Sequence, residues 1–340
     1  MYILEQCYQF LQSRLLPRIA KRHKKLFIFG FEALTLRPYI SLNGNARMTV
    51  ANRSTAESKI YRLVRNTAMR GYFPHFVFHL GLVKAHDIIN VDFSSFCGFE
   101  VLTFAKQTRL GRALPLFFAV MTYPVDEGSQ TRFIMTTLQA FTNLLGFAPH
   151  LVFDRGFESP YIVPFLVSRK IPFTIRLRKD KHVLYEQKDV PLRNLPWFEK
   201  DCMIGIYGLP LRVVVSEKLS ERKDTDGKEE SWYLLTNDYQ TAKEAIIARY
   251  YFRFEIEETF KDLKHIGDLQ KFHKITRIHT FTILLWFCML FLWFSFLLKS
   301  MKTYVKERVY KKRCKRLSLA KFFAEHIQLE LFSSFKAQFF

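Results

Sequence analysis

Paired cysteines are missing from this sequence. Five cysteines lie far apart along the chain, without a C-x-x-C motif and without the Cys/His spacings that zinc sites use: Cys7, Cys97, Cys202, Cys288 and Cys314. A zinc site built on paired ligands is therefore not expected. We interpret the thiols as reduced, which predicts a cytoplasmic protein.

Two other sequence signals are absent. There is no glycine-rich G-x-x-x-x-G-K-[ST] loop, which argues against ATP-driven activity and against a nucleotide cofactor. The N-terminus has no charged segment followed by an apolar stretch and a small-residue cleavage site, so no secretory signal is predicted. Residues 1–25 have instead the pattern of an amphipathic basic helix.

Acidic residues are too few to balance the basic ones. Asp and Glu number 31 against 52 Lys and Arg, which gives a net charge of +21 at pH 7. Because this much positive charge repels itself, the balance predicts a polyanionic partner. Nucleic acid is the first candidate and an anionic membrane surface the second. A basic surface without such a partner is the third interpretation.

One long stretch has no charged residue at all. Residues 280–298 read TFTILLWFCMLFLWFSFLL, and these 19 residues are within the length needed to cross a bilayer. A helix that is apolar on all sides also suits the centre of a large domain. We predict the buried helix and regard a membrane partner as the weaker alternative.

Between residues 86 and 180, short β-rich runs alternate with helical patterns. In chain order these are IINVDFSSF, EVLTFAKQTR, ALPLFFAVMTY, the helical SQTRFIMTTLQAFTNLLG, HLVFDRGF, the helical ESPYIVPFLVSRK and IPFTIRLRK. The order β-β-β-α-β-α-β is that of the ribonuclease H-like fold, an α/β fold with a mixed five-stranded sheet in which strands one and four are neighbours. Asp92 ends the first strand and Asp154 the fourth, so we expect the two carboxylates side by side.

The rest of the chain is expected to flank or interrupt this core. HVLYEQKDV and MIGIYGLPLRVVVSEKL read as strands, and ERKDTDGKEES between them and the next strand reads as a charged loop. The predicted organisation is a helical basic DNA-binding region at 1–85, the first part of the core at 86–180, a β-rich insertion at 181–240, a catalytic helix with the remainder of the core at 241–298, and a basic helical region at 299–340.

Four residues in the predicted catalytic helix follow the spacing Y-(2)-R-(3)-E-(6)-K: Tyr250, Arg253, Glu257 and Lys264. On one helix the last three fall at i, i+4 and i+11, which places two cations around one carboxylate. Such a face is unusual in a purely structural helix. Together with Asp92 and Asp154, Glu257 makes a candidate site of three carboxylates.

Three carboxylates suit the displacement of a phosphodiester. The reaction needs a nucleophile in line with the leaving oxygen, and two divalent ions about 3.5–4 Å apart stabilise both oxygens. Hard cations such as Mg²⁺ and Mn²⁺ bind carboxylate oxygens. Each aspartate, taken singly, also has the ordinary interpretation of a strand-end or helix-cap residue.

These motifs resemble a known family. INVDFS, LVFDRGF and the four spaced residues in RYYFRFEIEETFKDLK are similar to the DDE transposases of bacterial insertion sequences, in the cut-and-paste branch that carries this signature. The resemblance spans about residues 86–290. It implies that Asp92 bridges two Mg²⁺ or Mn²⁺ ions, with Asp154 on one and Glu257 on the other, and that a β-rich insertion precedes Glu257.

The other signature residues are expected to hold DNA. Arg253 offers a planar fork for a phosphate, Lys264 a point charge and Tyr250 a hydroxyl, and in the resembling family these positions lie next to the cleavage site. An i,i+4 salt bridge from Arg253 to Glu257 is the alternative. Phe254 stands where relatives commonly have tryptophan, so an indole N–H contact is lost there.

Three further residues are candidates for DNA contact. Some members of the resembling family stack an extruded base on an aromatic residue of the insertion, and Trp232 is our candidate, with strand-core packing as the alternative. Arg176 and Arg178 alternate along the fifth strand and therefore share one face, which either meets DNA or is solvated.

The sequence thus predicts a DNA transposase. It would cleave double-stranded DNA at the element ends and join those ends to target DNA, and a homodimer on DNA is expected because two ends are brought together. A nuclease without strand transfer would use the same carboxylates. A catalytically silent DNA-binding relic is disfavoured by the intact Asp92, Asp154 and Glu257, and a membrane protein is the last alternative.

Overall fold

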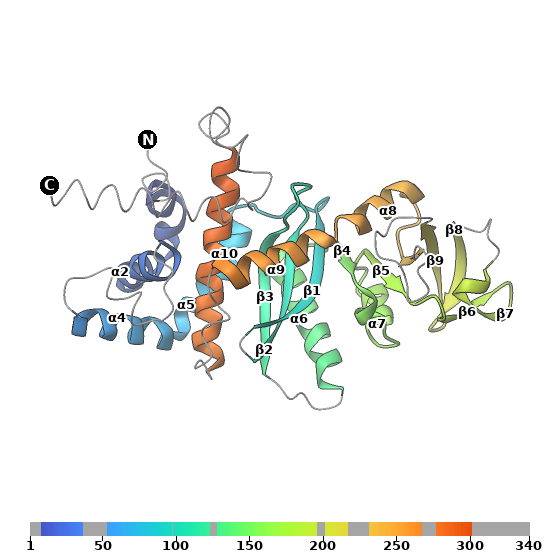
Figure 1. Ribbon diagram of the computed structural model, residues 1–340, viewed down its shortest axis with the longest axis horizontal. Helices are drawn as coiled ribbons and strands as arrows, with labels where there is room; N and C mark the ends of the chain where they lie inside the picture. Colours follow the sequence, from blue (N-terminus) through green and yellow to red (C-terminus); the bar gives the residue numbers. More distant parts are fainter. Residues whose placement is uncertain are drawn as a thin grey trace.

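The chain is built around a mixed sheet of ten strands with helices on its faces and at one end (Figure 1). The computed structural model describes residues 8–36, 53–96, 98–122, 128–195, 201–216, 231–266 and 277–300. In space the strands follow the order β3-β2-β1-β4-β5-β10-β9-β8-β6-β7.

The first half of the sheet alternates with helices in the predicted order: β1 (Ile88–Phe96), β2 (Phe99–Lys106), β3 (Leu114–Thr122), α6 (Ser129–Leu145), β4 (His150–Phe153), α7 (Ile162–Ser168) and β5 (Phe173–Leu177). β2 is antiparallel to β1 and β3, whereas β4 is parallel to β1 and β5. The predicted order of elements in this part of the chain is confirmed, and so is the adjacency of the first and fourth strands.

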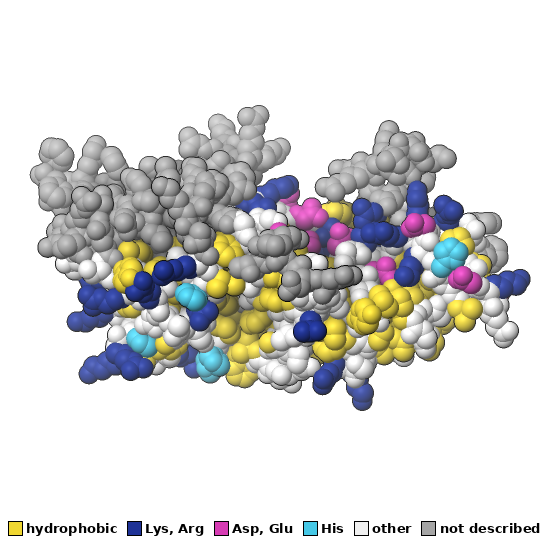
Figure 2. All heavy atoms as spheres, turned by 90° about the horizontal axis from the view of Figure 1, so that it is seen from below, with side chains coloured by type: hydrophobic (Ala, Val, Ile, Leu, Met, Phe, Trp, Pro, Cys, Tyr) yellow, Lys and Arg dark blue, Asp and Glu magenta, His cyan; other side chains and the backbone are white. Residues whose placement is uncertain are grey.

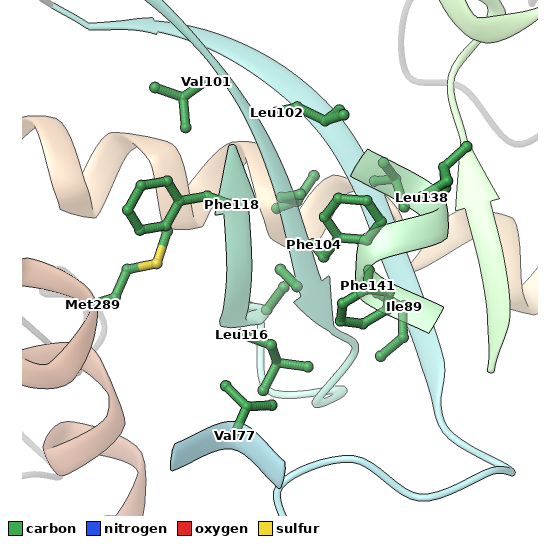
Figure 3. Close-up of a cluster of buried hydrophobic side chains, with 14 of the residues drawn as sticks. Val77, Ile89, Val101, Leu102, Phe104, Leu116, Phe118, Leu138, Phe141 and Met289 are labelled. Carbon is green, nitrogen blue, oxygen red and sulfur yellow. The ribbon is translucent and has the colours of Figure 1, made fainter. Parts of the chain in front are cut away.

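Side-chain alternation gives the two faces of this sheet different partners. Phe104 of β2 packs against Phe141 of α6, with ring centroids 4.5 Å apart, and Figure 3 shows both rings in one apolar cluster. Phe96 of β1 points to the opposite face and contacts Phe260 of α9 (Phe254–Ile266), with ring centroids 6.1 Å apart. Because side chains on a strand alternate, Asp92 shares the α9 face with Phe96.

The second half of the sheet comes from the residues after β5: β6 (His182–Tyr185), β7 (Lys188–Pro191), β8 (Asp201–Ile206), β9 (Leu209–Ser216) and β10 (Trp232–Thr236). β10 pairs antiparallel with β5, so these strands continue the sheet of the first half. The charged segment 221–230 lies outside the described residues.

Two runs that read as single strands are hairpins, so that part of the prediction is wrong. Positive φ angles at Glu186 and Gln187 turn β6 into β7, and positive φ angles at Tyr207 and Gly208 turn β8 into β9. Two consecutive residues with positive φ match the right-handed twist of the flanking strands. Only Gly208 is a residue that signals such a turn in the sequence.

The long helix α10 (Ile278–Ser300) packs against three N-terminal elements: η3 (Phe31–Leu36), α4 (Arg53–Arg65) and α5 (Thr67–His79). Before them in the chain come η1 (Leu11–Leu15), η2 (Leu16–Arg18) and α2 (Lys21–Gly30), and α2 contacts α10 through Phe27. α10 carries the apolar run and is buried between these helices and the sheet. Trp286 stacks on Phe73 of α5 and also contacts Phe118 of β3, with centroid distances of 5.0 and 4.5 Å. The prediction of a buried helix is confirmed.

No helix in the described part of the chain has both the length and the apolarity that a membrane crossing needs. The basic region predicted at 299–340 falls outside the described side chains. Cys288 is buried and carries a free thiol, and Cys7, Cys97 and Cys314 lie outside the described residues.

Gly30 lets α2 approach α10 closely. A Cβ at this position would lie 2.6 Å from a ring carbon of Phe287 and 2.8 Å from a methyl of Leu63, and both of these side chains are fully buried. We expect Gly30→Ala to lower the free energy of unfolding by about 1–3 kcal/mol, because overpacking outweighs the better helix propensity of alanine. Urea unfolding measures the change.

Gly71→Ala is the matched control. Gly71 is an exposed residue inside α5, and nothing lies within 4 Å of a Cβ built there. Alanine at this position should raise the free energy of unfolding by up to about 1 kcal/mol. A stabilising effect of both substitutions would contradict the close packing of α2 on α10.

Candidate active site

The pairing between the neighbouring strands β1 and β4 ends at one level, and the next residue on each side is an aspartate. The last register pair between β1 and β4 is Val91 with Phe153, so Asp92 and Asp154 are the next residues on the two strands. Their carboxylates are close enough for their charges to interact. The prediction that Asp92 ends its strand is wrong, because β1 continues along β2 as far as Phe96. What ends before Asp92 is the pairing with β4.

The signature residues lie on two helices joined by a tight turn. α8 (Lys243–Tyr251) ends before Arg253, and α9 begins after it. The backbone N–H of Arg253 donates to the carbonyl of Tyr250 at 3.0 Å, and that of Ile256 donates to the carbonyl of Arg253 at 3.1 Å. The turn leaves Glu257 in the first turn of α9, facing Arg253.

The guanidinium of Arg253 joins the carboxylates. Its Nη1 donates to Oδ2 of Asp92 at 3.0 Å, and its Nη2 donates to Oε1 of Glu257 at 2.7 Å. The Arg253 side chain is only 4% exposed. The salt bridge from Arg253 to Glu257, one of the two interpretations from sequence, is therefore present, and Asp92 shares the same cation.

Burial and charge act differently on the two aspartates. Desolvation raises the pKa of Asp92 to about 6, against the lowering effect of Arg253, and the charges of Asp154 and Glu257 raise it further. Desolvation also raises the pKa of Asp154, but Arg253, a backbone N–H and the Tyr250 hydroxyl together hold that pKa below its ordinary value. The cluster repels itself and gains from any cation placed within it.

Tyr250 supports Asp154 from the interior. The Tyr250 side chain is fully buried, and its hydroxyl donates to Oδ1 of Asp154 at 3.1 Å. Burial raises the pKa of Tyr250, so the hydroxyl keeps the proton that it donates. The hydroxyl that we expected on a DNA phosphate is instead bonded to a carboxylate of the site.

Trp232 is part of the core. It lies on β10 with no exposed surface, and its ring packs edge-on against Tyr250 with centroids 5.0 Å apart. A DNA base needs an exposed ring face for stacking. The base-stacking prediction is therefore wrong for this structure, and the alternative of strand-core packing describes the residue.

The three other basic candidates lie in different places. Arg176 on β5 is close enough to Asp154 for its charge to lower the pKa of that carboxyl. Arg178 is exposed and lies beyond β5, which ends at Leu177, so the prediction that both arginines share a strand face is wrong. Nζ of Lys264 lies 5.2 Å from the ring centroid of Phe96, at the end of β1.

The glutamates around Glu257 have other partners, which sequence reasoning did not distinguish. Glu255 is buried and accepts the backbone N–H groups of Thr108 at 2.8 Å and Gly111 at 2.9 Å, so it ties α9 to the turn between β2 and β3. Glu258 pairs with Lys261 on the surface. Glu257 is the one of the three that contacts Arg253.

Sequence reasoning also missed Asn90. This fully buried residue of β1 donates from Nδ2 to the carbonyls of Phe252 and Arg253 at 3.0 and 3.3 Å. The only signal in the sequence was a polar side chain inside an otherwise apolar strand pattern.

The donor chemistry of the cluster suits divalent ions. Among the described residues, no three Asp, Glu, His or Cys side chains are arranged ready to hold a metal ion. The positive charge in the cluster is supplied by Arg253 instead. Three carboxylates are nevertheless the hard oxygen ligands that Mg²⁺ and Mn²⁺ take, and their mutual repulsion favours a cation. The chemistry of Asp92, Asp154 and Glu257 therefore fits such an ion, while in this structure Asp92 and Glu257 are paired with the guanidinium of Arg253.

A buried histidine connects β4 to α8. Nε2 of His150 lies 2.9 Å from Oγ1 of Thr174, and Nδ1 lies 3.4 Å from Nη1 of Arg249. Arg249 in turn pairs with Asp238 at 2.6 Å. Burial, followed by the charge of Arg249, lowers the pKa of His150 to about 3.

We expect this histidine to make stability fall as the pH drops. His150 stays neutral in the folded chain while the unfolded chain takes up a proton below about pH 6.5, so its contribution is lost between about pH 6.5 and pH 3. Urea unfolding of His150→Gln at pH 7 and pH 5 should show a smaller loss than the wild type.

Asp92→Asn is the matched comparison for the pH test. The raised pKa of Asp92 acts in the opposite direction, because it favours the folded chain as the pH falls from about 6 toward 3.8. Asp92→Asn should therefore steepen the loss of stability at acid pH. The same pH dependence in the wild type and in His150→Gln would contradict a neutral buried histidine.

Comparison with known proteins identifies a family for this chain. No curated protein matches the sequence. The family described as the transposase DDE domain matches residues 111–293, which contain Asp154, Arg253 and Glu257, whereas Asp92 precedes the matched segment. Because the match covers more than half of the 340 residues, the chain belongs to the transposase DDE domain family.

Proposed function

We propose that this protein is a DNA transposase of the cut-and-paste branch, with Asp92, Asp154 and Glu257 as the ligands of two divalent ions. Its family implies an enzyme that cleaves nucleic acid in transposition, and DDE transposases generally use divalent metal ions. The observation that carries the proposal is the convergence of three carboxylates, from β1, from the end of β4 and from α9, on one buried guanidinium.

The strand order supports a ribonuclease H-like catalytic core. The arrangement β3-β2-β1-β4-β5, with β1 and β4 parallel, places two of the carboxylates on adjacent strands. We propose that residues 86–180 and 241–298 form this core and that 181–240 are an insertion that prolongs its sheet. Residues 1–85 would bind DNA, and 299–340 would add a basic helical region.

Each residue of the site would have its own role in phosphodiester cleavage. Bound divalent ions would stabilise the attacking and leaving oxygens of the phosphodiester. Asp92 lies between Asp154 and Glu257 in the charge network and would be the shared ligand. Tyr250 holds Asp154 through its hydroxyl. Arg253, released from the carboxylates, would present its planar fork to a DNA phosphate.

The charge of the molecule supports double-stranded DNA as the partner. Figure 2 shows Lys and Arg side chains spread along one face, on which Asp and Glu are fewer. Positive charge of this kind binds DNA phosphates without regard to sequence. We further propose strand transfer into target DNA, a homodimer that brings two element ends together, and action in the cytoplasm.

Replacing the carboxylates tests the proposed function. Asp92→Asn, Asp154→Asn and Glu257→Gln should each abolish Mg²⁺-dependent cleavage of a DNA carrying an element end, because each change removes a ligand oxygen charge. DNA binding, measured by fluorescence anisotropy in EDTA, should change little since it depends on many phosphate contacts.

The matched control is Glu258→Gln, on the next residue of the same helix. Glu258 pairs with Lys261 and, at 3.3 Å, with Arg112, and its side chain is 36% exposed, so the substitution should leave cleavage close to the wild-type rate. Wild-type cleavage by any one of the three site variants would remove that residue from the proposed site.

Arg253→Gln tests whether the guanidinium and the metal compete for the same carboxylates. Without Arg253 the buried carboxylates repel one another, so we expect a lower Tm in EDTA and a larger rise of Tm with Mg²⁺ than in the wild type. If Arg253 also contacts one phosphate on DNA, the log–log salt dependence of binding should flatten by about one unit.

Lys264→Gln is the control for this pair of measurements. Lys264 lies over Phe96, whereas Asp92 and Glu257 pair with Arg253. If Lys264 contacts one phosphate on DNA, its removal should therefore flatten the salt dependence of binding without changing the response of Tm to Mg²⁺. Equal Mg²⁺ responses in Arg253→Gln and in the wild type would show that the guanidinium does not stand in the place of a metal.

A further inference from the structure

Asn90 and Gln107 donate hydrogen bonds to the backbone at the junction between α8 and α9, and we call this pair the clamp. Asn90 donates from Nδ2 to the carbonyls of Phe252 and Arg253 at 3.0 and 3.3 Å. Gln107 donates from Nε2 to Oδ1 of Asn90 at 2.7 Å and to the carbonyl of Arg249, also at 2.7 Å. The side chain of Asn90 is therefore satisfied entirely by the junction and by its partner in the clamp.

The clamp replaces the hydrogen bonds that the helix loses at the junction. In a continuous helix the carbonyl of Arg249 would accept the N–H of Arg253. Here that N–H donates to Tyr250, and Gln107 takes its place on Arg249. Asn90 likewise donates to the carbonyl of Phe252, which accepts the N–H of Glu255, three residues ahead, at 3.2 Å.

Nothing in the local sequence explains the break. Residues 249–257 read RYYFRFEIE and contain no glycine, proline or serine, which are the usual causes of a sharp change of helix direction. A side chain that inserts into the helix hydrogen bonds is another cause of such a break, and Asn90 of β1 and Gln107 after β2 do this at the carbonyls of Arg249, Phe252 and Arg253.

The same strand fixes both ends of Arg253. Asn90 and Asp92 lie two residues apart on one face of β1, a spacing of about 6.5 Å that the sheet does not allow to change. Asn90 holds the backbone of Arg253, and Asp92 holds its guanidinium. β1 therefore sets where Arg253 lies, and with it the start of α9, which carries Glu257 in its first turn.

We propose that Asn90, assisted by Gln107, is a positioning residue for the catalytic carboxylates. By keeping α8 and α9 from joining into one continuous helix, Asn90 keeps Glu257 opposite Asp92 so that both can bind one cation. This inference rests on the proposed function of the site. A continuous helix would direct α9 differently and would separate Glu257 from Asp92.

Asn90→Leu removes the hydrogen bonds at similar side-chain volume. Asn90 bonds the backbone that carries Arg253 and Glu257, so we expect the affinity of the DNA-free protein for Mn²⁺, measured by electron paramagnetic resonance, to fall by about 10-fold, the lower end of the loss seen when a residue that orients metal ligands is removed. Cleavage per folded molecule should fall with it. Gln107→Ala should act in the same direction with a smaller effect, and it tests the clamp if Asn90→Leu does not fold.

Val91→Ala is the matched control for a purely structural role. Val91 is the next residue of β1, is fully buried, and points to the opposite face of the sheet. Its truncation should lower the free energy of unfolding but leave Mn²⁺ affinity unchanged. If Asn90→Leu and Gln107→Ala also change only stability, the positioning role is wrong.

Asp92→Asn separates a failure of this inference from a failure of the proposed function. If Asp92→Asn leaves Mn²⁺ affinity unchanged, the proposed metal site itself is wrong. If Asp92→Asn abolishes Mn²⁺ binding while both clamp variants bind Mn²⁺ like the wild type, the site stands and only the positioning role is overturned.

Discussion

The buried guanidinium of Arg253 is the constraint on which the site depends. A charge that is almost wholly removed from water must be paired, because an unpaired buried cation costs several kcal/mol. Asp92 and Glu257 pair with it directly, and Asp154 contributes its charge from the neighbouring strand. The carboxylates need the cation for the same reason, since burial raises the pKa of Asp92 to about 6. Three distant segments of the chain are thus drawn together.

Strand pairing and buried side chains fix the positions of Asp92, Asp154 and Arg253 in this ion cluster. Parallel pairing of β1 with β4 brings Asp92 and Asp154 to one level. Tyr250 fixes Asp154, and the clamp of Asn90 and Gln107 fixes the turn that carries Arg253. These supports fix the residues around the carboxylates, and the cation that Asp92 and Glu257 hold in this structure is the guanidinium of Arg253.

The apolar helix α10 shows how a hydrophobic segment is used away from the site. It lies between the N-terminal helices and the β3 edge of the sheet, with aromatic contacts on both sides. Every side chain from Phe281 to Leu290 except that of Thr282 is buried, and a helix surrounded in this way can be apolar all round. Burial of its rings, together with the close approach allowed at Gly30, couples the N-terminal helices to the core.

From the sequence alone, the order of strands and helices in residues 86–180 and a group of three candidate carboxylates could be predicted, because period, spacing and flanking residues are local properties. Tertiary structure decided which partner each polar group took. Tyr250 and Trp232 are buried, Glu255 accepts hydrogen bonds from backbone N–H groups, and Arg253 is paired with carboxylates. The break between α8 and α9 was equally invisible, since its cause is Asn90, which lies about 160 residues away in sequence and adjacent only once β1 is folded against the junction. Partners separated so far along the chain are chosen by burial and by hydrogen-bond satisfaction, which no local pattern encodes.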